Sequence, residues 1–141
     1  MQIDNTAKAH MPLSLPLLMW LFLIISLIAW TLLPSVLFPN LPLDVNEGLL
    51  WGQTWQWGYY KHPPLQAWLL QSTYEIAGTQ RWAYFLLAQL TIIVAMLGVY
   101  ATARRLAQPN QAALATLALS GIYYFNVTSI EFNPNTLQLA T

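Results

Sequence analysis

Acidic and basic side chains gather in one short stretch of this sequence, LDVNEGLLWGQTWQWGYYKHPPL, at positions 43–65. The acids are Asp44 and Glu47, and the bases are Lys61 and His62, directly before a Pro-Pro step. A carboxylate can take a proton from a bound group, and a lysine can bind an anion. The acids could also merely cap a helix, and the lysine could reach toward lipid headgroups. The residues alone leave both interpretations open, although ionisable groups at the edge of a bilayer are costly enough to suggest function.

The first half of this stretch predicts a short helix over 44–57. Asp44 suits the N-cap position, and Glu47 follows three residues later, which is the spacing of a capping box. Glu47, Trp51 and Trp55 would then share one face, at steps of four residues. Because Trp and Tyr favour the boundary between membrane and water, we expect this helix to lie on the bilayer surface.

A second short helix is predicted directly after the Pro-Pro step. Pro63 and Pro64 force an extended step, and a proline is well tolerated in the first turn of a helix. The segment LQAWLLQSTYEIAG that follows is apolar on one side and closes at Gly78. The sequence therefore predicts two interfacial helices joined by GYYKHPP.

The composition of the whole chain points to a membrane protein. Of its 141 residues, 57% are hydrophobic and only 7% are charged, whereas about 25% are charged in a typical soluble domain. The net charge is zero, so the chain has no basic surface for nucleic acid. With no cysteine, it has no disulfide framework and no thiolate metal site.

Long gaps between charged residues predict the membrane-spanning helices. Such a helix needs about 20 mostly apolar residues, and the gaps predict one over about 13–33, one over about 82–103 and one over about 112–128. Residues 34–81 form an amphipathic outer loop, and a further span begins near 135. A signal peptide is the alternative for the first segment, but no small-residue cleavage site follows it. We therefore expect an all-α, polytopic fold, in which this chain is the N-terminal part of a longer protein.

The positions of the basic residues predict the orientation. Cytoplasmic loops carry the excess of Lys and Arg. Lys8 precedes the first predicted span, and Arg104 and Arg105 end the second. We expect the N-terminus in the cytoplasm and the loop 34–81 on the periplasmic side of a cell inner membrane.

The order of these features resembles a known family. An acidic site after the first span, then an aromatic segment, then GYYKHPPLQAWL, is similar to the membrane glycosyltransferases of the GT-C fold. Among these, the chain most resembles the dolichyl-phosphate-mannose-protein mannosyltransferases and their bacterial aminoarabinose-transferase relatives. The matching parts are EGLLW, KHPPLQAWL and FNPNTLQLAT, so the resemblance covers most of the chain.

The resemblance implies inverting transfer of a sugar from a polyprenyl-phosphate donor to an acceptor on the outer face. Asp44 and Glu47 would be the catalytic carboxylates. Lys61 is the expected phosphate ligand, because histidine is only partly charged at neutral pH. The resemblance leaves the need for a divalent metal open, and the sequence contains no metal site of its own. The residues assigned to substrate binding are Lys61, His62, Tyr59, Tyr60, Trp51, Glu131 and Asn135.

Two departures from the family pattern affect these assignments. The adjacent Asp-Glu pair of the family is replaced by Asn46-Glu47, so either Asp44 takes the role on a shifted turn or Glu47 carries it alone. We favour Asp44 as the base, supported by Glu47. Asn135 stands where the family often has an acid, and Glu131 could take over that role or be a solvated loop residue. The alternative function is a non-catalytic membrane scaffold or transporter-like subunit whose outer loop binds lipid headgroups or a partner.

Overall fold

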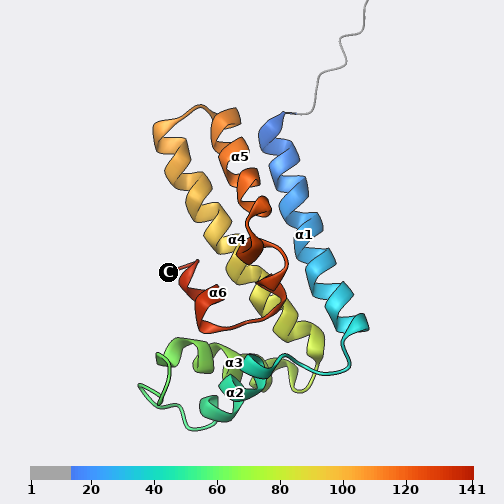
Figure 1. Cartoon of the computed structure of the whole chain (residues 1–141), viewed down its shortest axis with the longest axis vertical. Helices are drawn as coiled ribbons and strands as arrows, with labels where there is room; N and C mark the ends of the chain where they lie inside the picture. The colour runs from blue at the N-terminus through green and yellow to red at the C-terminus, as the bar shows by residue number, and fades with distance from the viewer. Residues whose placement is uncertain (1–13) are drawn as a thin grey trace, which may run out of the picture.

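The structure, a computed structural model, describes residues 14–141, and every regular element in this range is a helix (Figure 1). The all-α fold expected from the sequence is therefore confirmed for this range, whereas Lys8 lies outside the described residues. The α-helices are α1 (Leu15–Leu37), α2 (Leu43–Gly52), α3 (Pro64–Ala77), α4 (Arg81–Leu106), α5 (Pro109–Ala118) and α6 (Pro134–Gln138). Three short 3-10 turns, Leu119–Gly121, Tyr123–Phe125 and Thr128–Ile130, connect α5 to α6.

The two long helices, α1 and α4, run antiparallel along the molecule (Figure 1). They have 23 and 26 residues, which at about 1.5 Å per residue makes them roughly 35 and 39 Å long. The hydrocarbon core of a bilayer is about 30 Å thick. Both helices are therefore long and apolar enough to cross a membrane. Their bounds lie close to the predicted segments 13–33 and 82–103.

Helix α5 packs against both long helices and completes a small apolar core. Met19, Leu23, Ile92, Met96 and Ala113 are buried there. On its other side α1 leaves large aliphatic side chains exposed along its length, which suits a helix that faces lipid. These exposed residues include Ile24, Ile25, Ile28, Leu32, Leu33, Val36 and Leu37.

The predicted helix over 112–128 differs from the structure, because α5 begins earlier and ends at Ala118. Pro109 opens the helix, and a capping box between Gln108 and Gln111 closes its first turn. Side chains then compete for backbone carbonyl groups, as Ser120 Oγ donates to Leu117 O at 2.7 Å. The helix has 10 residues, or about 15 Å. A continuous helix through residue 128 was therefore a wrong expectation.

Helix α2 also differs from the predicted helix over 44–57, since it covers only Leu43–Gly52. Pro42 occupies the N-cap position and no side chain caps the helix, so the predicted capping box is wrong. Asp44 lies in the first turn, where the positive end of the helix dipole stabilises a negative charge. Trp55 lies beyond the helix with φ +47° and does not share its face.

Helix α3 agrees with the prediction made from its proline and glycine residues. Pro64 is its first residue, and Gly78 follows its last with φ +60°, a conformation that glycine adopts without strain. Helices α2 and α3 pack together at the end of the molecule opposite α5 (Figure 1). A second core joins them to α4 and to the chain before α6, through Val45, Leu70, Tyr84, Ala88 and Phe132.

Candidate functional site

Glu47 and Lys61 form an ion pair between α2 and the loop that precedes α3. Lys61 Nζ lies 2.8 Å from Glu47 Oε1, although the residues are 14 positions apart in sequence. The hydrogen bond and charge of Glu47 raise the pKa of Lys61 above its usual value, and the charge of Asp44 adds to this. The side chains are 52% and 33% exposed, so a ligand can reach the pair from solvent.

Three aromatic rings stand beside this ion pair. Trp51 lies one turn after Glu47 on α2 and stacks on Tyr59, with ring centroids 5.8 Å apart and planes at 12°. His62 packs against the same indole at 5.5 Å. The Tyr59 backbone N–H donates to His62 O at 3.2 Å, which closes the loop around Lys61. The structure thus brings together five of the residues predicted for the site.

Asp44 and Glu131 are neighbours, despite the distance between them in the sequence. Glu131 follows the last 3-10 turn, and its pKa is raised, first by burial and then by the negative charge of Asp44. The nearby backbone N–H of Asp44 favours the charged carboxylate and lowers the pKa of Glu131 in part. Two carboxyl groups therefore meet at the N-terminus of α2, a place where the helix itself favours negative charge.

A cleft of about 470 Å³ opens beside Glu131. One wall is the chain that leaves α1, including Asn40 and Pro42, and the other is the irregular segment from Tyr123 to Glu131. Glu131 is thus both partly buried and accessible from this cleft.

Two predicted site residues stand apart from these groups. The Tyr60 side chain is 97% exposed, next to Lys61 in the chain but directed to solvent. Asn135 is exposed in the first turn of α6. Within residues 14–141, neither side chain has a hydrogen bond to another residue of the site. Their roles in substrate binding stay predictions.

Comparison with protein families matches residues 61–141 to the family described as dolichyl-phosphate-mannose-protein mannosyltransferase. This segment is more than half of the chain. The chain belongs to this family. The resemblance deduced from the sequence is thereby confirmed, and it identifies the chain as belonging to a membrane glycosyltransferase of the GT-C type. No curated protein and no solved structure gives a significant match.

The family match begins at Lys61, which divides the site into two parts. Lys61, His62, Glu131 and Asn135 lie within the matched segment. Asp44, Glu47 and Trp51 of α2, and Tyr59 and Tyr60 of the loop that follows, precede this segment. The link between the two parts therefore rests on the contacts in the structure, above all the ion pair from Glu47 to Lys61.

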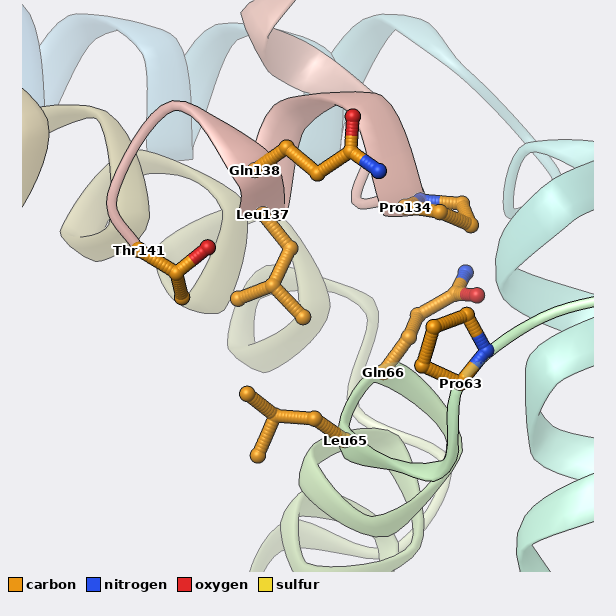
Figure 2. Close-up of a pocket in the computed structure, with 7 residues that line it drawn as sticks. All are labelled: Pro63, Leu65, Gln66, Pro134, Leu137, Gln138 and Thr141. Atoms are coloured by element: carbon orange, nitrogen blue, oxygen red, sulfur yellow. The ribbon is translucent and has the colours of Figure 1, made fainter. Parts of the chain in front are cut away.

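Two buried glutamines close to the site were not anticipated from the sequence. Gln66, in the first turn of α3, is 3% exposed, and Gln89, in the middle of α4, is 2% exposed. Gln66 also lines a pocket of about 110 Å³ between α3 and α6, where its amide extends between Pro63 and Pro134 (Figure 2). For Gln89 the available signal was an amide in the middle of a mostly apolar helix, because burying an amide is costly without a hydrogen bond.

The described residues do not assemble a metal site of the usual kind. Within residues 14–141, no group of three or more His, Cys, Asp or Glu side chains could hold a metal ion. Glu47 pairs with Lys61, and Glu131 lies near Asp44.

Proposed function

We propose that this chain carries part of the active site of an enzyme that transfers a sugar from a polyprenyl-phosphate donor. The acceptor is a lipid, glycan or protein group on the outer face of the membrane. One observation carries the proposal. A solvent-accessible pair of Glu47 and Lys61 is bordered by aromatic rings, at one end of two helices long enough to cross a bilayer. A donor with an apolar tail and a polar sugar needs lipid for its tail and water for its sugar, and the two meet at this end of the helices.

The residues suit an inverting displacement. The acceptor O–H gives its proton to a carboxylate, for which we propose Asp44, and its oxygen bonds to the anomeric carbon. The bond from that carbon to the phosphate oxygen breaks, and its electron pair leaves on the polyprenyl phosphate. Lys61 would stabilise this charge, since cations aimed at a leaving phosphate lower the barrier. Glu47 would hold Lys61 in place.

The arrangement of helices supports the orientation expected from the sequence. The start of α1 and the end of α4, with Arg104 and Arg105, lie at one end of the molecule, and α2 and α3 lie at the other (Figure 1). The rule that cytoplasmic ends are rich in Lys and Arg then favours the periplasmic side for α2 and α3. We therefore propose that the reaction occurs on the outer face of the inner membrane.

Transfer of labelled sugar from polyprenyl phosphate, in membranes that contain the full protein, tests this function. We expect Asp44→Asn to reduce transfer by about 10²–10⁴-fold, as is usual for the loss of a general base. Glu47→Gln and Lys61→Met should reduce it less, because they weaken the hold on phosphate without removing the base. Glu75→Gln is the matched control, since Glu75 is exposed on α3 and its bond is to Gln71.

All variants are compared at equal expression, so that a change in transfer is not a change in the amount of protein. Full transfer by Asp44→Asn and Glu47→Gln would move the catalytic carboxylate elsewhere. Absence of transfer by the unaltered protein, with several donor sugars, would favour the non-catalytic scaffold.

A further inference from the structure

The segment that carries Glu131 has an irregular backbone. Residues 119–130 form three 3-10 turns in place of a continuous helix, next to α1 and α4. Backbone groups that leave a helix beside apolar elements need other hydrogen-bond partners, because water is scarce there. The partners of this segment therefore decide where Glu131 is held.

Gln89 supplies one of these partners from the middle of α4. Its Nε2 donates to Ser129 O at 2.8 Å and to Ser129 Oγ at 3.2 Å. Ser129 is completely buried. The bond ties the last 3-10 turn to a helix that is held on its other faces by α1 and α5.

Gln66 supplies the second partner, from the first turn of α3. Its Nε2 donates to Phe132 O at 3.3 Å, and Phe132 is completely buried in the core with Val45 and Tyr84. Gln66 Oε1 has no partner among the described residues, so the donated bond is what Gln66 contributes here. The two carbonyl groups bound by Gln66 and Gln89 stand on either side of Glu131.

Glu131 itself is held by two further bonds. Its N–H donates to Thr128 O at 3.1 Å, and its carbonyl accepts from Thr136 Oγ1 at 3.0 Å. With the backbone fixed on both sides, the direction of the carboxyl group toward Asp44 depends on the position of the whole segment.

We infer that Gln66 and Gln89 are positioning residues, whose side-chain amides hold the segment 129–132 so that Glu131 stays beside Asp44. The inference rests on the proposed function for its relevance to catalysis. The two amides act from different helices, α3 and α4, so they fix the segment from two directions. They set the separation of two carboxyl groups that no local sequence pattern brings together.

Carbon-13 NMR of labelled glutamate side chains tests this inference without a transferase assay. The chain has three glutamates, Glu47, Glu75 and Glu131, so the Glu131 signal can be assigned with Glu131→Gln. In the unaltered protein, Asp44→Asn should lower the pKa of Glu131 by removing the neighbouring charge. In Gln66→Met or Gln89→Met, the same Asp44→Asn change should have less than half of that effect, because the carboxyl groups have moved apart.

Gln71→Met is the matched control, because Gln71 bonds only to Glu75 on the surface of α3 among the described contacts. It should leave the coupling between Asp44 and Glu131 unchanged. Full coupling in both Gln66→Met and Gln89→Met would overturn the inference. So would the absence of any effect of Asp44→Asn in the unaltered protein, which needs neither glutamine variant to fold.

The same variants separate this inference from the proposed function. Coupling that falls as expected, in variants that transfer sugar normally, would confirm the positioning role and show that transfer does not depend on the placement of Glu131. Full coupling in both glutamine variants would overturn the positioning role and leave the proposed function to the Asp44→Asn transfer assay.

Discussion

At the scale of residues, the carboxyl group of Glu131 lies near Asp44, which is in the first turn of α2. A single acid in the first turn of α2 would be favoured by the helix dipole. A second acid beside it is disfavoured, since like charges and partial burial both oppose ionisation. The pKa of Glu131 is accordingly raised, first by burial and then by the charge of Asp44. A carboxyl group with a raised pKa holds its proton to a higher pH than a free one.

This raised pKa predicts how the stability of the fold depends on pH. Folded Glu131 binds its proton more tightly than in the unfolded chain, where the ordinary value is 4.5. Stability therefore falls as the pH rises from that value through the folded pKa. Glu131→Gln lacks this loss, so it should be more stable than the unaltered protein at pH 8, with a smaller difference at pH 4. Denaturant unfolding in detergent, followed by tryptophan fluorescence, measures both.

The same pH series on Glu75→Gln is the control, because it measures how replacing an exposed glutamate changes the stability of the fold. A stability difference for Glu131→Gln that is constant from pH 4 to pH 8 would contradict the prediction, because it would mean that Glu131 titrates alike in the folded and unfolded chain.

Much of this site could be read from the sequence because its parts are local. Lys61, His62 and the Pro-Pro step are adjacent, and a proline pair followed by an apolar run marks a helix start directly. The approach of Glu131 to Asp44 could not be read in this way. It depends on a turn held by glutamines from two other helices, and the sequence pattern of a helix does not contain its tertiary hydrogen bonds.

At the scale of elements, the same distinction explains which helices were predicted correctly. The ends of α3 follow from Pro64 and Gly78, and α4 begins at Arg81 and ends just after Arg104 and Arg105, close to the limits of its charge gap. Helix α1 instead continues through Pro34 to Leu37, beyond the predicted end at 33. Helix α2 stops at Gly52 instead of continuing to Trp57, and its packing on α3 gives the reason. Gly52 lets the α2 backbone approach the α3 backbone closely, and Gly48 leaves room for the Leu70 side chain. After Gly52 the chain turns and brings Lys61 back to Glu47.

The close approach of α2 and α3 can be tested at one glycine. A Cβ on Gly52 would lie 2.6 Å from the carbonyl oxygen of Ala67 and 2.8 Å from the Cβ of Gln71. The backbone of α3 at Ala67 cannot move aside as the end of a flexible side chain could. We therefore expect Gly52→Ala to destabilise the fold by about 1–3 kcal/mol, the usual range for overpacking. Unfolding in mixed micelles measures the loss.

Gly98→Ala on α4 is the matched control, since nothing lies within 4 Å of a Cβ at that position. It should be neutral or stabilise the helix by roughly 0.5–1 kcal/mol, because glycine is a poor helix former. Equal effects of the two substitutions would mean that α2 and α3 do not approach as closely as the structure has them.

At the scale of the whole molecule, the antiparallel pair of α1 and α4 separates two chemically different ends. One end has Arg104 and Arg105 in the last turn of α4. The other has the Glu47–Lys61 ion pair, Glu131 near Asp44, and the tryptophan-rich loop after α2. Trp68 of α3 holds this loop, because its Nε1 donates to Gln56 O at 3.0 Å and its ring packs on Trp57. Since Trp and Tyr favour the membrane boundary, this end suits a reaction between a lipid-borne donor and a polar acceptor.

The orientation of these two ends can be measured with single introduced cysteines, because residues 1–141 contain no cysteine. Thr54→Cys would place a thiol in the exposed loop after α2, and Asn110→Cys would place one in the exposed first turn of α5. In intact cells, we expect a membrane-impermeant maleimide to label Thr54→Cys and to reach Asn110→Cys only after permeabilisation. Labelling in the opposite order would put Asp44 and Glu131 on the cytoplasmic face. The donor and acceptor would then have to meet there, and the proposed outer-face reaction would be excluded even if the residues act as proposed.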